Sequence, residues 1–210
     1  MRKIDLRKQW QRLYASSAKT VEVVDVPAFL FAMIDGKMQP GETPQMSQEF
    51  QEAIGALYGI SFTLKFMSKQ RKDDPIDYGV MALEGLWWTA SGEFDINKPE
   101  NWQWTLMIMQ PEHITAEMFQ EALRQLKKKR DSPALSQLRL ERFHEGLCIQ
   151  TMHVGPYSTE PATIEKMKAF AQEHGYRYRG KHHEIYLGDP RRAAPEKLRT
   201  VLRQPVEPIT

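Results

Sequence analysis

The chain has 210 residues, of which 41% are hydrophobic and 27% are charged, so it can bury the core of one domain or of two fused halves and is not expected to be disordered. Its 29 basic and 27 acidic residues give a formal charge of +2, which does not favour nucleic acid as a partner. The first residues lack the apolar run of a signal peptide, and no stretch is apolar over the roughly 18 residues of a membrane span. We therefore expect a cytoplasmic protein that binds neither nucleic acid nor a membrane.

The first half of the chain predicts a helical segment followed by a mixture of strands and one long helix. Residues 1–20 carry apolar side chains at rough helical spacing and predict one short helix. Residues 21–26 and 29–34 have the composition of strands. Thr43, with Pro44 directly after it, is typical of a helix start, and an apolar stripe extends this helix toward Phe66.

Two further strands and a connecting helix complete the first half. Residues 78–88 and 102–109 predict strands, and the second is apolar on both faces. A strand of that kind lies inside a sheet or borders a cavity. Thr115 then caps a helix that extends over 116 to about 130, where basic residues suit the helix end.

The order of elements begins again after this helix. Residues 138–143 and 147–154 predict strands, Ser158 or Thr159 caps a helix that Gly175 ends, and residues 176–187 and 198–203 predict strands. Both halves thus have the order strand, helix, strand, strand, which indicates a duplicated βαββ unit. We predict an α+β fold with antiparallel sheets, helices on one face, and a ligand groove between the repeats on the other face.

The predicted limits follow from this duplication. The N-terminal helical segment covers 1–20 and the domain covers 21–210. Within the domain, repeat one spans about 21–111, the connecting helix about 115–130 and repeat two about 138–205.

Several common catalytic motifs are absent from the sequence. It has no phosphate-binding loop, no glycine-rich dinucleotide turn and no G-x-S-x-G nucleophile elbow. The histidines do not show an H-x-x-x-H spacing, and the single Cys148 cannot form an intramolecular disulfide. We therefore expect no metal site and no cofactor.

A carboxylate lies within the predicted strand at 181–188. Alternation places His182, Glu184 and Tyr186 on one face, with the apolar Ile185 on the other. A carboxylate that is out of water needs a partner, a raised pKa or a cationic ligand. The alternative is an edge strand with Glu184 in solvent.

A second acid, Glu84, precedes the pair Trp87 and Trp88. A lone carboxylate among aromatic rings can pair with a lipophilic cation, and it can also act as a general base on water. Binding and hydrolysis thus use the same residue. The two Trp side chains point to opposite faces of a strand, so one can anchor the core while the other lines a ligand site.

Six sequence blocks, in order along nearly the whole chain, match a known family. They are Val26-Pro27 leading to Ile34-Asp35-Gly36, Leu83-Glu84-Gly85-Leu86-Trp87-Trp88, the run from Trp102 to Pro111, His153-Val154-Gly155-Pro156-Tyr157, His182-His183-Glu184-Ile185-Tyr186-Leu187 and Asp189-Pro190-Arg191-Arg192. On these blocks the chain resembles the GyrI-like small-molecule-binding proteins, most closely their stand-alone branch without a DNA-binding domain.

The resemblance implies a duplicated βαββ fold with a central groove, in which aromatic side chains and one Glu bind bulky aromatic, often cationic drugs and dyes. Some stand-alone members are similar to hydrolases that open the strained cyclopropane of spirocyclic DNA-alkylating antibiotics, where the Glu activates water. By motif, Glu184 takes this catalytic role and Tyr157 is its neighbour. From strand faces we assign the ligand walls to four further aromatic residues, Trp87, Trp88, Trp104 and Tyr186.

Three functions stay open at this point. The protein could hydrolyse cyclopropanoid compounds in a resistance role, could sequester drugs without chemistry, or could inhibit a partner protein such as a gyrase. The third function predicts an exposed apolar patch and weak affinity for dyes. The sequence makes no prediction of oligomeric state.

Overall fold

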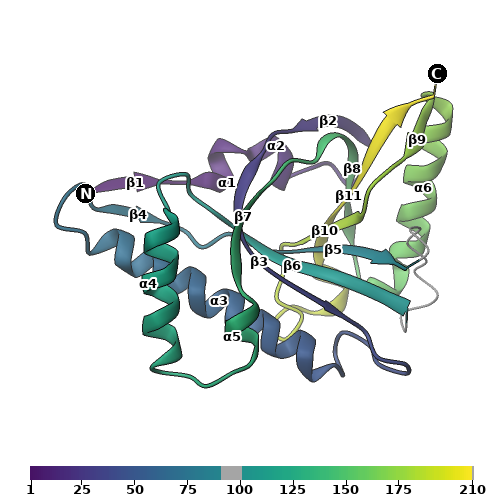
Figure 1. Ribbon diagram of the computed structural model, residues 1–210. Coiled ribbons are helices and arrows are strands. Elements are labelled where there is room, and N and C mark those ends of the chain that lie inside the picture. Colours follow the sequence, from purple (N-terminus) through teal and green to yellow (C-terminus); the bar gives the residue numbers. More distant parts are fainter. Residues whose placement is uncertain (91–100, 210) are drawn as a thin grey trace.

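The structure, a computed structural model, describes residues 1–90 and 101–209. Its strands are β1 (Arg2–Ile4), β2 (Glu22–Val26), β3 (Phe29–Lys37), β4 (Ile76–Tyr78), β5 (Leu83–Thr89), β6 (Trp102–Gln110), β7 (Arg139–Phe143), β8 (Gly146–Val154), β9 (Tyr176–Tyr178), β10 (His182–Tyr186) and β11 (Arg199–Pro208). Its α-helices are α1 (Leu6–Gln9), α2 (Gln11–Tyr14), α3 (Gln48–Lys69), α4 (Ala116–Lys127), α5 (Ala134–Gln137) and α6 (Glu160–Glu173). Figure 1 shows how they are arranged.

One large antiparallel sheet forms the centre of the described residues. Its strand order is β2-β8-β11-β10-β5-β6-β3-β7, with β9 paired to the end of β11. Repeat one supplies β3, α3, β5 and β6, and repeat two supplies β8, α6, β10 and β11 in the same order. The α+β class and the duplicated order of elements are therefore confirmed. The two repeats join through the ladder between β5 and β10.

The outermost strands are exchanged between the repeats. β2 lies at the start of repeat one in the chain but pairs with β8 of repeat two. β7 lies at the start of repeat two but pairs with β3 of repeat one. Each repeat is thus completed at its outer edge by a strand that belongs, in sequence, to the other repeat.

The long helices α3 and α6 lie on the same face of the sheet. From α3, the ring of Phe50 stacks on Trp87 with 5.5 Å between centroids. From α6, Ile164 and Met167 pack in a second cluster of buried residues with Leu202 of β11. Facing residues of an antiparallel ladder point to the same side, and the Cα partners are Trp87 with His182 and Glu184 with Leu202. Glu184 therefore lies on the helix-bearing face, whereas the ligand groove was predicted on the other face.

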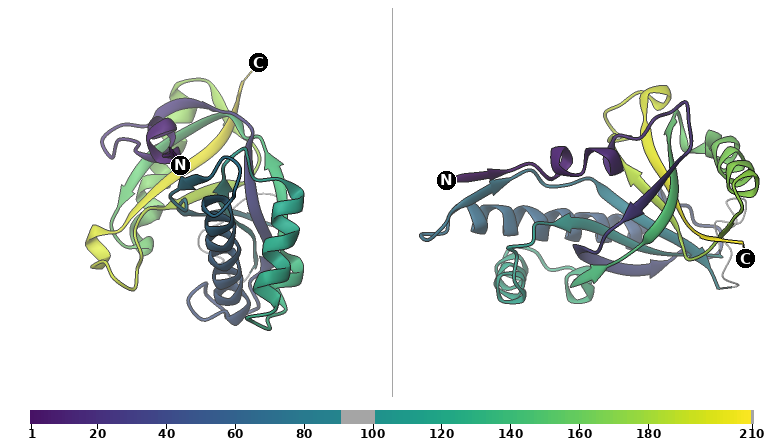
Figure 2. Two further views of the ribbon diagram at one scale, coloured as in Figure 1. Left: turned by 90° about the vertical axis from the view of Figure 1, so that its left-hand side faces the viewer. Right: turned by 90° about the horizontal axis from the view of Figure 1, so that it is seen from above.

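The opposite face of the sheet is covered in part by the N-terminal segment. This segment forms β1 and the two short helices α1 and α2, where one helix was predicted. Its Leu6, Leu13 and Tyr14 are buried in the main core. In Figure 2 the purple N-terminal segment lies on the other side of the molecule from α3 and α4. The segment is thus an integral part of the fold.

Three predicted boundaries differ from the structure. α3 begins after Ser47, whose side chain accepts a hydrogen bond from the Phe50 backbone, while Thr43 lies in a preceding turn. The predicted strand at 176–187 is divided into β9 and β10, with Gly180 at a φ of 62° between them. The last strand extends to Pro208 because its far end pairs with β9.

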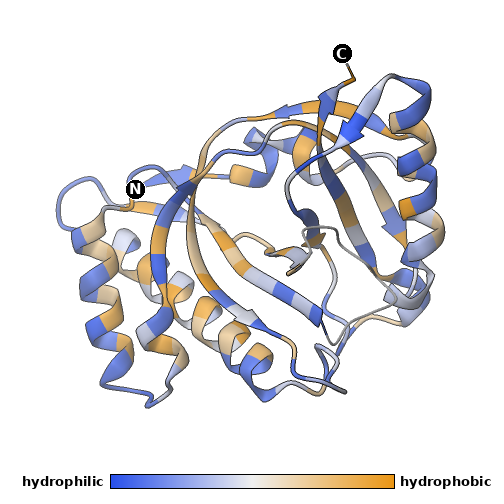
Figure 3. Cartoon of the chain, turned by 45° about the vertical axis from the view of Figure 1, so that its right-hand side comes forward, coloured by the Kyte–Doolittle hydropathy of each residue, from blue (hydrophilic) through white to orange (hydrophobic). Residues whose placement is uncertain are grey.

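The buried hydrophobic side chains form two clusters. The larger one contains residues of α3 and of the N-terminal segment, and a smaller one lies beneath α6. Figure 3 shows hydrophilic segments among the hydrophobic ones along the strands, and several of these polar residues are buried. Among the described residues, no helix is long and apolar enough to cross a membrane.

Candidate functional site

A short chain of hydrogen bonds holds the Glu184 carboxylate. Its Oε2 accepts a 2.8 Å hydrogen bond from the Tyr186 hydroxyl, and that hydroxyl accepts a 3.0 Å bond from Trp87 Nε1. His182 Nε2 lies 3.4 Å from Glu184 Oε1. We call this arrangement of Trp87, Tyr186 and Glu184 the Glu184 relay. β10 lies between β5 and β11 and Glu184 is only 7% exposed, which rules out the alternative of a solvated edge strand.

A glycine makes room for this relay. Gly85 is the Cα partner of Glu184 on β5. A Cβ atom at Gly85 would lie 2.8 Å from Trp87 Nε1 and 3.0 Å from the Tyr186 hydroxyl oxygen. The missing side chain therefore leaves the space in which the indole and the phenol meet.

Two more groups reach the relay from the start of α6. The ring of Tyr157 contacts that of Tyr186 edge-on, with 6.0 Å between centroids. Burial, and then the charge of Glu184, raise the pKa of Tyr157 to about 12, so its hydroxyl keeps its proton at neutral pH. Glu160, the first residue of α6, is 2% exposed, and burial followed by the charge of Glu184 raises its pKa to about 9. The site thus combines one carboxylate, two phenols and a second carboxyl group.

The Trp residues assigned to the ligand walls lie in different places. Trp87, in the relay, also contacts Trp102 with 5.3 Å between ring centroids. Trp104 is its cross-strand neighbour, but it is fully buried between Phe50 and Gly36, where a Cβ atom would come within 2.1 Å of the indole. Trp87 is therefore part of the site, and Trp104 supports it from the core.

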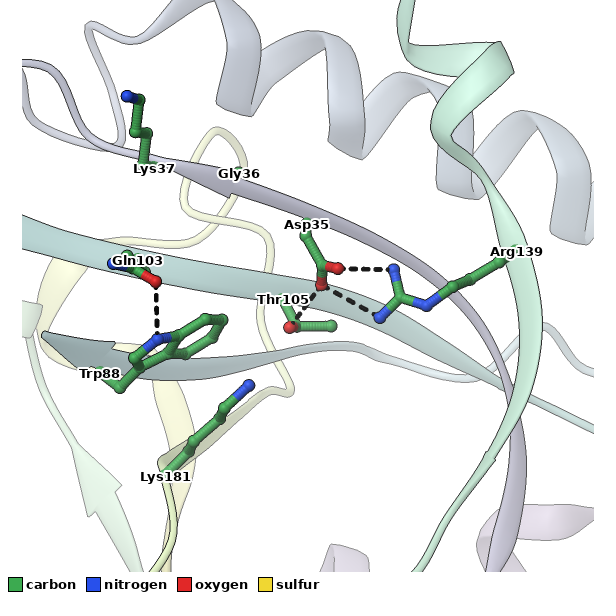
Figure 4. Close-up of a pocket in the computed structure, with 8 residues that line it drawn as sticks. All are labelled: Asp35, Gly36, Lys37, Trp88, Gln103, Thr105, Arg139 and Lys181. Atoms are coloured by element: carbon green, nitrogen blue, oxygen red, sulfur yellow. Dashed lines mark hydrogen bonds and ion pairs between the residues drawn. The ribbon is translucent and has the colours of Figure 1, made fainter. Parts of the chain in front are cut away.

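Trp88 points to the opposite face of the sheet. Its Nε1 donates a 2.8 Å hydrogen bond to Gln103, and Lys181 Nζ lies 3.3 Å from the ring centroid. With Asp35 and Arg139, these residues border an open pocket of about 510 Å³, shown in Figure 4. Asp35 and Arg139 are paired with each other at 2.9 Å. This pocket is separate from the Glu184 relay.

Glu84 also faces away from the relay and is completely buried. Its Oε1 accepts a 2.7 Å hydrogen bond from the Tyr14 hydroxyl, and its Oε2 lies 3.0 Å from His183 Nε2. His183 Nδ1 lies 3.0 Å from Glu145, which also contacts Arg203 at 3.2 Å. A histidine that donates from both nitrogens is a cation, so two carboxylates and two cations balance. We call these five residues the buried ion cluster.

The pKa values within the buried ion cluster agree with this charge balance. Burial alone would lower the pKa of His183, but its contacts with Glu145 and Glu84 raise it above the usual value. Burial alone would raise the pKa of Glu145, but His183 and Arg203 lower it to about 2. Arg203 also donates to the backbone oxygen of Leu13. The cluster therefore fastens the N-terminal segment to the sheet and has a structural role.

The structure places Glu184, Tyr186, Tyr157 and Trp87 close together, and beside them Glu160, which sequence reasoning did not name. An acidic residue in the first turn of a helix is common because it complements the helix dipole, so the sequence pattern did not distinguish Glu160 from an ordinary helix-start residue. A usable clue was its place three residues after Tyr157. Among the described residues, no group of three or more His, Cys, Asp and Glu side chains could hold a metal ion.

The duplicated sheet with a buried carboxylate beside aromatic rings is the architecture of a class of small-molecule-binding domains. A model described as the GyrI-like small molecule binding domain matches residues 19–207. The chain belongs to this GyrI-like family.

Solved structures agree with this assignment. An uncharacterized conserved protein from Listeria innocua is 40% identical, with 97% of this chain and 100% of that chain covered and a TM-score of 0.88. A hydrolase from Listeria innocua is 38% identical over 97% of this chain and 100% of its own, with a TM-score of 0.83. The C-terminal domain of EcmrR, at 11% identity, 90% and 98% coverage and a TM-score of 0.55, shares the fold alone. No curated protein matches the chain.

Proposed function

We propose that the Glu184 site binds bulky aromatic, often cationic xenobiotics and hydrolyses those that carry a strained cyclopropane, in a detoxifying role in the cytoplasm. The observation that carries the proposal is the Glu184 relay, a nearly buried carboxylate oriented by a phenol and an indole. The hydrolase from Listeria innocua at 38% identity supports the catalytic part.

Binding follows from the character of the site. A carboxylate in a poorly solvated place gains from a cationic partner, because the partner replaces the water that the carboxylate has lost. Aromatic ring faces also attract cations, and the rings of Tyr157, Tyr186 and Trp87 lie around Glu184. A flat lipophilic cation satisfies both requirements.

Hydrolysis uses the same carboxylate as a general base. Glu184 takes a proton from a water molecule as the water oxygen forms a bond to a cyclopropane carbon. In a substrate whose cyclopropane is conjugated to a ring carbonyl, the strained carbon–carbon bond breaks and its electron pair moves through the ring system to the carbonyl oxygen. This oxygen becomes a phenol after protonation. The product is heavier than the substrate by one water. Tyr157, which keeps its proton at neutral pH, orients the substrate in this proposal.

The test compares the wild-type protein with Glu184→Gln. Intrinsic Trp fluorescence is titrated with a planar lipophilic cation, and a cyclopropanoid compound is then incubated with each protein and analysed by mass. We expect tight quenching that the substitution weakens, and a hydrated product formed by the wild type over many turnovers.

Other outcomes assign the alternative functions. Binding that saturates at one ligand per site, without product, would identify a sequestering protein. Absence of quenching in both proteins would overturn the proposed site and favour a protein-binding role, for which the half-exposed Phe62 and Phe66 of α3 are the apolar candidates. Equal dye affinity and equal hydrolysis in Glu184→Gln would show that another residue acts.

A further inference from the structure

A second carboxyl group enters the Glu184 site from the helix side. Glu160 hydrogen-bonds to Thr200 of β11. In the ladder between β10 and β11, Thr200 is the Cα partner of Tyr186, whose hydroxyl holds Glu184. Register thus places the Glu160 carboxyl group next to the relay, with α6 above it and the sheet below.

The surroundings of Glu160 favour its neutral form. It is 2% exposed and its Oε1 has no hydrogen-bond partner among the described residues. Burial, and then the negative charge of Glu184, raise its pKa to about 9, while the bond from Thr200 lowers it. An unpaired oxygen on a buried neutral acid is costly for the fold unless a ligand uses it.

Other titratable groups around Glu160 come from the turn before α6 and from the strands β8 and β10. Tyr157 precedes α6, and Tyr186 and His182 share the face of Glu184 on β10. His153, the Cα partner of Thr200 on β8, hydrogen-bonds through its ring to Thr159 and Thr163. Both histidines have polar contacts of their own. Glu160, in contrast, is an acid with one oxygen that has no hydrogen-bond partner among the described residues.

We propose that Glu160 is the proton donor of the Glu184 site and gives its proton to the ligand oxygen on which the electron pair collects. The inference rests on the proposed function. As water attacks the cyclopropane carbon, Glu184 takes the water proton, the carbon–carbon bond breaks, and the carbonyl oxygen receives the electron pair and the proton of Glu160. A proton then returns from Glu184 to Glu160, so the net change is the addition of one water. One carboxyl group thus acts as the base and the other as the acid.

The experiment compares Glu160→Gln and Glu184→Gln with the wild type. Gln keeps the shape and neutrality of the protonated acid but has no proton to give. We expect Glu160→Gln to reduce kcat by about a hundredfold, the lower range for a general acid, with almost unchanged affinity for a planar dye cation. We expect Glu184→Gln to reduce both kcat and the affinity for the dye cation. The wild-type rate should fall as pH rises through about 9, and this fall should be absent in Glu160→Gln.

Two additional measurements separate proton donation from a structural role. Thr200→Val removes the bond that lowers the pKa of Glu160, so it should move the alkaline fall in rate to higher pH. Infrared spectra at neutral pH should show a protonated carboxyl band in the wild type and in Glu184→Gln that Glu160→Gln lacks.

The outcomes distinguish this inference from the proposed function. If the wild type hydrolyses the compound and Glu160→Gln does so at the same rate, the role of Glu160 is overturned and the proposed function is kept. A carboxyl band that persists in Glu160→Gln has the same meaning. A dye affinity that falls equally in both Gln variants means that Glu160 is ionised, which also overturns it. Absence of hydrolysis in the wild type overturns both.

Discussion

Gly85 and Glu184 are direct partners across the ladder that joins the two repeats. The position beside the carboxylate thus carries no side chain, and the Trp87 indole and the Tyr186 hydroxyl occupy that space. Because β5 belongs to repeat one and β10 to repeat two, the Glu184 relay exists only where the two repeats meet.

We expect Gly85→Ala to disturb the relay. The new methyl group would lie 2.8 Å from the indole nitrogen and 3.0 Å from the phenol oxygen, so both groups must shift, and we expect the hydrogen bond from Tyr186 to Glu184 to be lost. Loss of this hydrogen bond should weaken dye binding about tenfold, and overpacking should cost about 1–3 kcal/mol of stability. Dye titration and denaturant unfolding measure the two effects.

A matched control is available at Gly79, where a Cβ atom meets nothing within 4 Å. Gly79→Ala should leave dye affinity unchanged. If Gly85→Ala binds dye as tightly as this control, the relay does not position Glu184.

We expect ligand quenching to come from Trp87 and not from Trp88. The two indoles are adjacent in sequence, but Trp87 lies in the relay while Trp88 borders the pocket on the other face. Trp87→Phe should therefore remove most of the quenching by a dye and weaken its binding, since Tyr186 loses its donor. Trp88→Phe, measured in the same titration, should keep both. The reverse result would place the ligand on the face shown in Figure 4.

We expect His183→Gln to be strongly destabilising. It leaves Glu84 and Glu145 buried without the cation between them. Breaking a buried ion pair by removing one partner costs about 3–5 kcal/mol. The matched control is Arg177→Gln, which removes an exposed ion pair with Glu207 and should change stability by less than about 1 kcal/mol. Denaturant unfolding of both variants checks this, and a small effect in His183→Gln would contradict the charge assignment of the buried ion cluster.

We expect the buried ion cluster to limit stability in acid. The pKa of Glu145 is about 2 in the folded protein, below its ordinary value of 4.5. Its contribution is therefore fully present above the unfolded pKa and is lost as the pH falls from about 4.5 toward 2. Unfolding free energies between these pH values should fall more steeply in the wild type than in Glu145→Gln. Parallel pH profiles would show that Glu145 is not the group responsible.

The sequence was informative where one strand or one helix carries the pattern. Alternation along β10 placed Glu184 and Tyr186 on one face, and Thr115 was correctly assigned as the cap of α4. The order of elements identified the duplication because it repeats along the chain. Each of these features depends on neighbours in sequence, where periodicity and capping act.

The features of the fold and of the site that the sequence did not predict depend on contacts between segments that are distant in the chain. Tyr14 meets Glu84 across 70 positions, and Arg203 reaches the Leu13 oxygen across 190. The sequence also did not predict which face of the sheet α3 covers, because that depends on contacts such as those of Phe50 with Trp87 and Trp104. α3 starts after Ser47, whose side chain caps the turn that carries Phe50, rather than after Thr43.

The exchange of β2 and β7 determines how the protein can be divided. A gene fragment that encodes only 21–111 would produce β2 without its partner β8, and β3 with the side that faces β7 unpaired. Exposed strand edges of this kind lead to aggregation or to pairing with a second copy. Because each half needs the outer strand of the other, neither half can be shortened independently to produce a smaller protein.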